Sequence, residues 1–316
     1  MPEVSVIIPY YNDEQFIDEA ILSVINQTYQ DWEIVVVDDG SNNDARRLIQ
    51  KYPGRILYFH QENRGAGAAR NLGVSKAHGK WLAFLDADDV WYPHKLDVQL
   101  KHASRHPEAD FIYADMDTID EKSQIIGERF LTVKRRRKKR KPLSLRSLVF
   151  QGRPFPYPST VLVKKKCFLK AGGFNALFRG NYHEDFECFA RIAQTSSLQF
   201  ISESLVKYRV SAPNKRLNIS TREVNWKLLL DSLREMWSEE PIKLQVLSRY
   251  YAKHFIQKGT RYLALNRHLA ARRSFKIAFF YHKSHLRCLH WWLVCLIPSV
   301  GTWYARSKQL GSKKSD

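Results

Sequence analysis

The chain has 316 residues, of which 44% are hydrophobic and 13% aromatic, and its formal net charge is +19. This composition excludes a disordered or fibrous chain and leaves room for one large α/β domain with a smaller appendage. The excess of positive charge predicts an anionic partner, such as nucleic acid, lipid headgroups or a phosphorylated substrate, unless it serves solubility alone.

The first 90 residues alternate buried strands with helices, which is the pattern of βαβ units. Asn12 is the predicted cap of the first helix, with Gln15 three positions on. Strands in this region repeatedly end in polar or acidic residues, and ligands of open α/β sheets bind at the carboxyl ends of strands. The predicted elements are strands at 4–9, 33–38, 56–60 and 81–85, and helices that follow Asn12, end near Tyr52 and cover 64–77.

The regular alternation of strands and helices ends after residue 90, and from Pro213 onward the pattern is almost wholly helical. We therefore predict an α/β domain at 1–212, with a Rossmann-like, mostly parallel central sheet flanked by helices, and an all-helical region at 213–316. The predicted elements of the second half of the domain are a helix at 94–104, a strand at 110–114 that leads into a hairpin, a strand at 159–163, a turn at 172–174, a helix from His183 and a strand at 198–208.

Two segments predict contact with a membrane surface. The run KRRRKKRK at 134–141 reads as an exposed loop, in which each cation contributes ~1 kcal/mol near anionic lipid. Near the C-terminus, Trp291, Trp292 and Trp303 stand among basic residues. That combination suits the membrane interface, although the same tryptophans could form the core of a helix packed on the domain.

Three features favour a cytoplasmic protein, attached at most peripherally to the cytoplasmic face of the membrane. The four cysteines have neither zinc-site nor redox-motif spacing, which favours a reduced setting. Met1 leads directly into an apolar strand, without the basic region and cleavage site of a signal peptide. The apolar run at 291–297 is far shorter than the ~20 residues of a membrane span.

Asp86-Ala87-Asp88 follows a predicted strand and is a candidate metal site. Strand alternation would place both carboxylates on one side, with Ala87 opposite. Mg²⁺ and Mn²⁺ bind one or two such carboxylates together with phosphate oxygens and water. Alone, the same pattern also describes a solvated acidic loop.

Five segments together resemble the ordered motifs of the family 2 glycosyltransferases, which have the GT-A fold, depend on nucleotide-sugars and include inverting enzymes. They are VSVIIPYYN at 4–12, VVVDDGS at 35–41, NRGAGAARNLG at 63–73, WLAFLDADD at 81–89 and HEDFECFAR at 183–191. The resemblance implies that 1–90 bind the nucleotide-sugar and that 91–212, with the basic loop at 134–141, bind the acceptor.

The resemblance also implies roles for single residues. Asp185 is the expected general base, with Glu184 as second choice, although acids that open a helix also complement its dipole. Asp88 is the expected direct ligand of a Mn²⁺ or Mg²⁺ ion, and Asp86 a contact of the ribose or of the metal's water. The expected nucleotide-sugar contacts are Pro9, Tyr11, Asn12, Asp38, Asp39, Gly65, Arg70, Asn71, Asp86, Ala87 and Asp88. For Asp38 and Asp39, a helix cap and turn is the alternative.

The chain departs from the family pattern in two places. Many members carry a metal-binding histidine shortly after a Tyr-Arg pair, whereas Tyr208-Arg209 is followed by Val210-Ser211. The Gln-x-x-Arg-Trp motif and the membrane spans of polymer-forming members are missing too, which favours addition of a single sugar.

We therefore expect transfer from a nucleotide-sugar, with uridine favoured by resemblance, to a hydroxyl of a glycan or lipid-linked acceptor in cell-surface polysaccharide synthesis. One alternative is a nucleotidyltransferase, but such enzymes place a Gly-rich basic loop after the first strand, where this chain has Tyr10-Tyr11-Asn12-Asp13. The other is nucleic-acid binding, which the concentration of charge in one run and the lack of a recognisable module oppose.

Overall fold

The computed structural model describes residues 1–42, 51–52, 54, 56–133, 155–178, 183–210, 219–236, 238, 252, 255–256, 258–260, 262–263 and 267–281. The predicted helix before Tyr52, the basic run at 134–141 and the tryptophan-rich end lie outside the described residues. The chain divides into two compact units, Met1–Leu233 and Arg234–Asp316. The division of roles between 1–212 and 213–316 stays a prediction.

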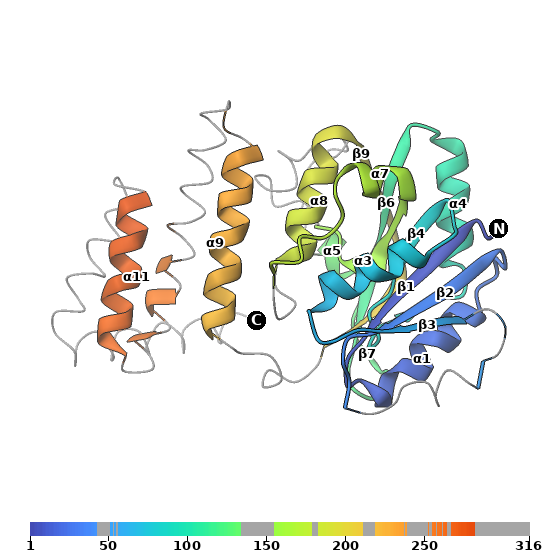
Figure 1. The fold of residues 1–316 in the computed structure, drawn as a ribbon, viewed down its shortest axis with the longest axis horizontal. Coiled ribbons are helices and arrows are strands. Elements are labelled where there is room, and N and C mark those ends of the chain that lie inside the picture. The colour runs from blue at the N-terminus through green and yellow to red at the C-terminus, as the bar shows by residue number, and fades with distance from the viewer. Residues whose placement is uncertain are drawn as a thin grey trace. The chain divides into compact units, whose positions relative to one another are not determined.

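Nine strands of the first unit form one sheet, in the order β3-β2-β1-β4-β8-β6-β9-β5, with β7 paired to β6 (Figure 1). The strands are β1 (Val4–Tyr10), β2 (Trp32–Asp38), β3 (Ile56–His60), β4 (Trp81–Phe84), β5 (Val90–Trp91), β6 (Ala109–Ile119), β7 (Ile125–Gly127), β8 (Val161–Lys164) and β9 (Ser197–Arg209). The described helices of this unit are α1 (Glu14–Ile25), α3 (Ala66–Lys76), α4 (Lys95–Arg105), α5 (Phe130–Val133), the 3₁₀ turn η1 (Pro158–Thr160), α7 (Lys165–Lys170), α8 (Glu184–Thr195) and most of α9 (Ile219–Met236).

The parallel half of the sheet follows the prediction. β3, β2, β1 and β4 are mutually parallel, with Tyr10 paired to Asp38 at the carboxyl ends of β1 and β2. Backbone bonds continue beyond the strands, because Asp39 N–H donates to Tyr10 O at 2.8 Å and Leu85 N–H to Ile7 O at 3.0 Å. The segments that follow β1, β2 and β4 therefore lie at one edge of the sheet.

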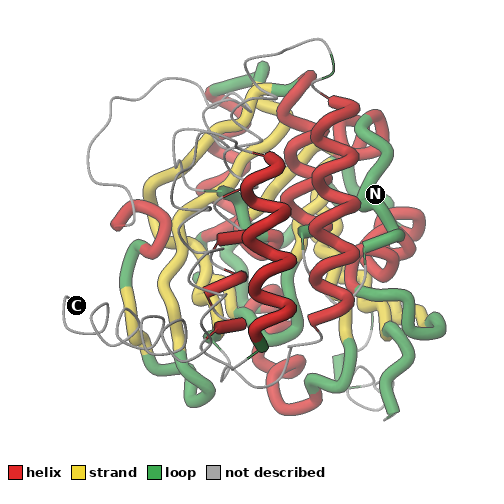
Figure 2. The backbone as a smooth tube through the Cα atoms, turned by 90° about the vertical axis from the view of Figure 1, so that its left-hand side faces the viewer, coloured by secondary structure: helices red, strands yellow, loops and turns green. Residues whose placement is uncertain are grey.

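The prediction of a mostly parallel sheet is wrong for the other half. β8 is antiparallel to both β4 and β6, β5 is antiparallel to β9, and β7 is antiparallel to β6, whereas β6 and β9 are parallel. Of the predicted strand at 159–163, Ser159 and Thr160 belong instead to η1. Pro158 opens that turn, since its ring fixes φ near the helical value. Figure 2 shows the strands side by side as yellow tubes.

Helices cover both faces of the sheet, which explains why its central strands are continuously apolar. In β1, Ile8 packs in a core cluster with residues of α1 and α4, whereas Ile7 packs in a second cluster with residues of α3, α7 and α8. Helix α3 comes very close to the strands at Gly73, where a Cβ would lie 2.5 Å from Ile7 Cγ2. The small residues of α3 thus bring that helix, and the site residues it carries, onto the sheet.

The few described residues of the second unit are almost all helical, and the helical character of 213–316 as a whole stays a prediction. Its long helix is α11 (His268–Tyr281), where Ala278 packs in a small cluster with Ala252, Phe255 and Ile256. Among the described helices of the whole chain, none is long and apolar enough to cross a membrane.

Candidate functional site

The loops after β1 and β2 are fastened to each other by the predicted nucleotide-binding residues. Asn12 has a left-handed backbone, with φ 51°. Its N–H donates to Ser41 Oγ at 3.1 Å, and its Oδ1 accepts from Asn42 N–H at 2.9 Å. The prediction that Asn12 caps α1 is therefore wrong, because the N-cap position is Asp13 and Asn12 uses its amide oxygen on the neighbouring loop. Beside it, Pro9 is half-buried and Tyr11 is exposed.

Asp38 and Asp39 are both buried and both accept several hydrogen bonds. Asp38 accepts from Ser41 N–H at 2.8 Å and from the Tyr58 hydroxyl at 2.7 Å. Asp39 accepts from the Gln61 side chain at 2.7 Å and from the N–H groups of Arg64 and Gly65, each at 2.8 Å. Asp38 thus holds the turn that follows β2, as the alternative of a cap and turn expects, whereas the helix predicted beyond it lies outside the described residues. Asp39 instead holds the entry to α3.

Gly65 is the residue before α3, and its φ of +91° lies in the region that favours glycine. A substituted residue would be strained there, whatever space surrounds it. Gly65 thus sets the direction in which α3 leaves the Asp39 loop, and α3 in turn carries Arg70 and Asn71.

Arg70 joins three of the sequence motifs at one point. Its side chain is only 3% exposed, and its guanidinium donates to Asp86 Oδ1 at 2.5 Å and to Glu184 Oε1 at 3.3 Å. It also lies 5.3 Å from the centre of the Phe174 ring. Burial acts to lower the pKa of Arg70, but the charges of Asp86 and Glu184 outweigh it, so that the pKa is raised. Arg70 is therefore a fixed cation between the segment that follows β4 and the start of α8.

Asn71 supports this arrangement from the next position. Its amide nitrogen donates to Phe174 O at 2.7 Å, and its Oδ1 accepts from Phe174 N–H at 2.9 Å. The turn that it holds includes Gly172 and Gly173, at φ +82° and +67°. Because both polar ends of its side chain are engaged, Asn71 positions this turn in the structure, and a direct contact with the nucleotide stays a prediction.

Asp86, Ala87, Asp88 and Asp89 form a turn, which we call the acidic turn. Strand β4 ends at Phe84, and Asp89 N–H donates to Asp86 O at 3.0 Å. The prediction that strand alternation places Asp86 and Asp88 on one side is therefore wrong, because a turn rather than a strand carries them. Ala87 is buried in the core beneath, which anchors the turn.

Ser159 and Asp89 fix the acidic turn from below. The Ser159 hydroxyl accepts from Asp86 N–H at 3.1 Å and donates to Asp89 Oδ2 at 2.5 Å. Asp89 is almost fully buried, and burial, followed by the charges of Asp88 and Asp86, raises the pKa of its carboxyl. Sequence reasoning missed Ser159, because its partners lie about seventy positions away in the chain.

Arg209 is the second functional residue that sequence reasoning missed, although the Tyr208-Arg209 pair was visible. Its guanidinium, fully buried, donates to Asp88 O at 2.7 Å, to Asp120 O at 2.8 Å and to Glu19 Oε2 at 2.6 Å. Its own N–H donates to Asp89 Oδ1 at 2.9 Å. Arg209 thus ties the acidic turn to α1 and to the β6–β7 hairpin.

Replacing Arg209 with methionine is expected to lower the free energy of unfolding by about 3 kcal/mol, because Glu19 and two backbone carbonyls lose a buried cationic donor. Urea denaturation measures this loss, and hydrogen–deuterium exchange of residues 86–89 should accelerate. Lys101→Met, which breaks an exposed pair with Asp97, is the control. Unchanged exchange at 86–89 would show that Arg209 does not hold the turn.

Glu184 and Asp185 open α8, as predicted. Glu184 is 5% exposed, and its Oε2 has no hydrogen-bond partner among the described residues. Asp185 Oδ1 accepts from Phe186 N–H at 2.7 Å. Burial, together with the charges of Glu184 and Asp86, raises the pKa of Asp185 to about 7, against the opposing effects of that hydrogen bond and of Arg70. A carboxylate with this pKa is well matched to accept a proton near neutral pH.

The described residues hold no group of three or more His, Cys, Asp or Glu side chains that could bind a metal ion. The acidic turn offers two candidate ligands, Asp86 and Asp88, and one oxygen of Asp86 already accepts from Arg70. A donor set of two hard oxygen ligands fits Mg²⁺ or Mn²⁺ when a diphosphate supplies the rest. The residues present therefore fit a metal bound jointly with substrate, rather than a preformed protein site.

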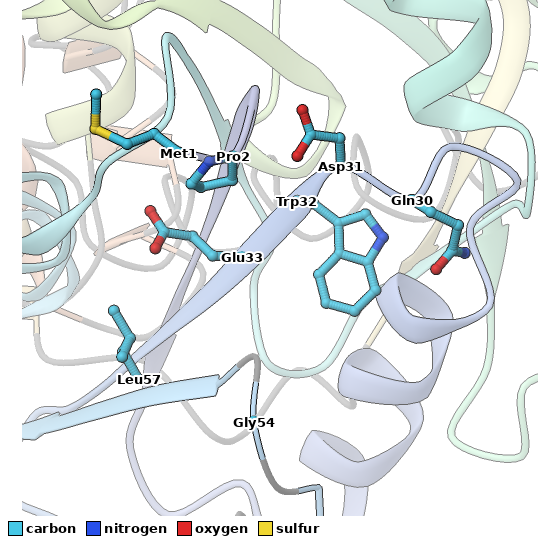
Figure 3. A pocket seen from close by; sticks show the side chains of 8 residues that line it. All are labelled: Met1, Pro2, Gln30, Asp31, Trp32, Glu33, Gly54 and Leu57. Carbon is cyan, nitrogen blue, oxygen red and sulfur yellow. The ribbon is translucent and has the colours of Figure 1, made fainter.

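A cavity of about 300 Å³ lies elsewhere, at the start of the strands (Figure 3). Its lining includes Met1, Asp31, Glu33 and Leu57. β1 and β2 begin beside it and run to the opposite edge, where Tyr10 and Asp38 lie. None of the predicted site residues lines this cavity, so we do not assign the candidate site to it.

The model of the family described as "Glycosyl transferase family 2" matches residues 5–169. An uncharacterized glycosyltransferase of Rickettsia typhi, RT0329, is 33% identical over 238 residues, which are 73% of this chain and 73% of that protein. An uncharacterized glycosyltransferase of Rickettsia felis is 32% identical over 252 residues, 77% of this chain but 40% of the relative. The match to the Rickettsia prowazekii protein RP339 covers 65% of that protein. The chain thus spans less than two thirds of some of its relatives.

The putative teichuronic acid biosynthesis glycosyltransferase TuaG of Bacillus subtilis is 40% identical over 105 residues, 32% of this chain and 41% of that protein. Among solved structures, S. aureus TarS 1–349 in complex with UDP-GlcNAc has a TM-score of 0.67 at 18% identity, covering 98% of this chain and 92% of that one. This likeness confirms the predicted GT-A-like fold. Together with the five ordered motifs, the family match over 5–169 and the relative that is 33% identical over 73% of both chains establish that the chain belongs to glycosyl transferase family 2.

Proposed function

We propose that this protein transfers a sugar from a UDP-sugar to a hydroxyl of a glycan or lipid-linked acceptor, in the synthesis of a cell-surface polysaccharide. The observation that carries the proposal is Arg70, which brings Asp86 of the acidic turn and Glu184 of α8 to one buried cation. Donor-side and acceptor-side acids thereby meet at the carboxyl edge of the parallel strands, where α/β folds bind ligands. The names of TarS bound to UDP-GlcNAc and of TuaG support the donor and the pathway class.

On the donor side, we assign the nucleoside to the loops that Asn12, Asp38 and Asp39 hold together. Residues 1–90 then form the nucleotide-sugar half and residues 91–212 the acceptor half. A divalent cation, held by Asp88 and Asp86 with the diphosphate oxygens, would neutralise charge on the departing diphosphate.

On the acceptor side, Asp185 takes the proton of the attacking hydroxyl. The hydroxyl oxygen forms a bond to the anomeric carbon from the face opposite the diphosphate. The bond between that carbon and the diphosphate oxygen breaks, and its electron pair leaves with the nucleoside diphosphate. A single displacement of this kind inverts the anomeric centre. General-base assistance contributes about 10²- to 10⁴-fold to such a step.

The direct test is release of nucleoside diphosphate from a panel of nucleotide-sugars, with Mn²⁺ and with EDTA. We expect release from a UDP-sugar, and calorimetry should detect UDP binding that depends on the metal. Asp88→Asn is expected to weaken that binding about tenfold or more, whereas Asp110→Asn, which alters a partly exposed acid paired with Lys164, should not. Release from no donor, with no binding of any nucleoside diphosphate, would refute the proposal.

We also propose peripheral attachment to the cytoplasmic face of a membrane, through the basic run at 134–141 and the tryptophan-rich C-terminus. Eight cations next to anionic lipid would suffice for reversible binding at ~1 kcal/mol each. Deleting residues 134–141 should reduce co-sedimentation with vesicles that contain phosphatidylglycerol, and should leave the weak binding to neutral vesicles unchanged. Equal sedimentation of both proteins with anionic vesicles would contradict the role of this run.

A further inference from the structure

The segment 155–160 connects the proposed base to the acidic turn. At one end, the Phe155 ring stacks on Phe186, the residue after Asp185, with ring centres 4.4 Å apart and planes at 20°. At the other end, Ser159 bonds to both sides of the acidic turn. Tyr157 is midway along this segment. The segment that carries Tyr157 is therefore fastened at both ends to the acids that the proposed reaction uses.

Tyr208 reaches the same place from β9. The next residue, Arg209, bonds to Asp88 O and Asp89 Oδ1, which fixes Tyr208 beside the acidic turn. The rings of Tyr157 and Tyr208 meet edge to face, with centres 5.2 Å apart. Phe130 completes the group, with its ring centre 6.3 Å from that of Tyr157. We call these three rings the aromatic platform.

The charges around the platform are consistent with this position. Burial and then the charge of Asp185 raise the pKa of Tyr157. Burial, followed by the charges of Asp89 and other groups of the acidic turn, raises the pKa of Tyr208. Each tyrosine therefore lies within electrostatic reach of one of the two acidic groups.

The platform also carries the hydroxyl groups of two tyrosines, Tyr157 and Tyr208. Both side chains are half-buried rather than buried. Neither hydroxyl has a hydrogen-bond partner in the described part of the chain, and neither is among its buried polar atoms without a partner. Tyr58 and Tyr92 differ, since their hydroxyls donate to Asp38 and Asp117. Among the described residues, the platform thus offers aromatic surface and two tyrosine hydroxyls without a partner.

We propose that the aromatic platform binds a neutral sugar ring of the acceptor. The C–H face of a pyranose is apolar enough to pack on aromatic rings, and its hydroxyls can pair with those of Tyr157 and Tyr208. A sugar in this place would present a hydroxyl toward Asp185. The Asp185 carboxylate, whose charge acts on Tyr157, would repel a uronate or a phosphate on the same ring. This inference rests on the proposed function and narrows its acceptor to a neutral saccharide at this position.

The test measures binding of methyl glycosides of glucose, galactose, N-acetylglucosamine and glucuronic acid by saturation-transfer-difference NMR, with UDP and Mg²⁺ present. At least one neutral glycoside should bind, and the glucuronide should bind more weakly. Tyr157→Ala is expected to weaken binding of the neutral glycoside about tenfold, and Tyr157→Phe and Tyr208→Phe about threefold each. The matched control is Tyr29→Ala, which alters a half-buried tyrosine three positions before β2.

The affinity for UDP, measured by calorimetry, distinguishes a failure of the proposed function from a failure of the aromatic platform. If UDP does not bind at all, the proposed function fails. If UDP binds but no neutral glycoside does, only the platform is refuted. It is equally refuted if Tyr157→Phe and Tyr208→Phe bind glycosides as the parent does, or if the glucuronide binds best. The phenylalanine variants keep the packing of each ring, so the test stands even if Tyr157→Ala does not fold.

Discussion

Asp185→Asn is expected to lower the rate of sugar transfer by about 10²- to 10⁴-fold, because asparagine cannot accept the proton of the attacking hydroxyl. The substitution keeps the size of the side chain, and its Oδ1 can still accept from Phe186 N–H. Affinity for UDP should therefore be unchanged, which calorimetry can check. Glu187→Gln is unsuitable as a control, since Glu187 binds Arg191 in the same helix, but Asp110→Asn alters a partly exposed acid outside the candidate site.

The pH dependence gives a second readout of the same residue. The base must be ionised, and its pKa is raised to about 7. Transfer, followed as kcat/KM, should therefore fall about tenfold for each pH unit below 7 and reach a plateau above it. Near-full activity of Asp185→Asn, or a profile without the fall in kcat/KM below pH 7, would show that another group, such as Glu184, is the base.

The raised pKa also has a consequence for stability. A carboxyl whose pKa is higher in the folded than in the unfolded protein destabilises the fold once pH exceeds its unfolded pKa, and the cost is complete above the folded value. At pH 8, Asp185→Asn should therefore be more stable than the parent by about 2 kcal/mol. This figure is smaller than the full difference between the two pKa values would give, because the Asp185 side chain keeps some exposure to solvent. At pH 4 the difference should vanish.

The sequence predicted best those elements that local pattern determines. Runs such as Val35 to Val37 are buried on both faces, so they read as parallel strands without knowledge of their neighbours. Strand β8 was harder, because its partners β4 and β6 lie far from it in the chain. Nothing in the three apolar residues of β8 specifies antiparallel pairing, and this is why the sheet is mixed where a mostly parallel one was predicted.

In the candidate site, too, the sequence identified single residues but not their tertiary contacts. Motif order was enough to select Arg70, Asp86 and Glu184 as site residues, but not to join them. Their contact closes a loop of 114 positions between Arg70 and Glu184, which depends on how α3 and α8 pack on the same face of the sheet. The conformation of Asn12 and the acidic turn likewise depends on tertiary bonds from Ser41, Ser159 and Arg209.

Arg70→Met is expected to lower the free energy of unfolding by about 3–5 kcal/mol, because it leaves Glu184 as an uncompensated buried charge. Asp86 is 28% exposed and can be hydrated, so most of the cost should come from Glu184, at 6%. Urea denaturation at neutral pH measures the change. Lys164→Met, which breaks the partly exposed pair with Asp110, should cost less than about 1 kcal/mol.

The double variant Arg70→Met with Glu184→Met separates the ion pair from the packing of Arg70 on Phe174. Removing both partners of a buried pair is often nearly neutral, so the double variant should recover most of the stability that the single variant loses. Activity should not recover, because Asp86 then has no cation to orient it against the donor diphosphate. If the double variant were instead as unstable as Arg70→Met, the stabilising role of Arg70 would lie in its contact with Phe174 or Asp86, and Glu184 would be free to serve the reaction directly.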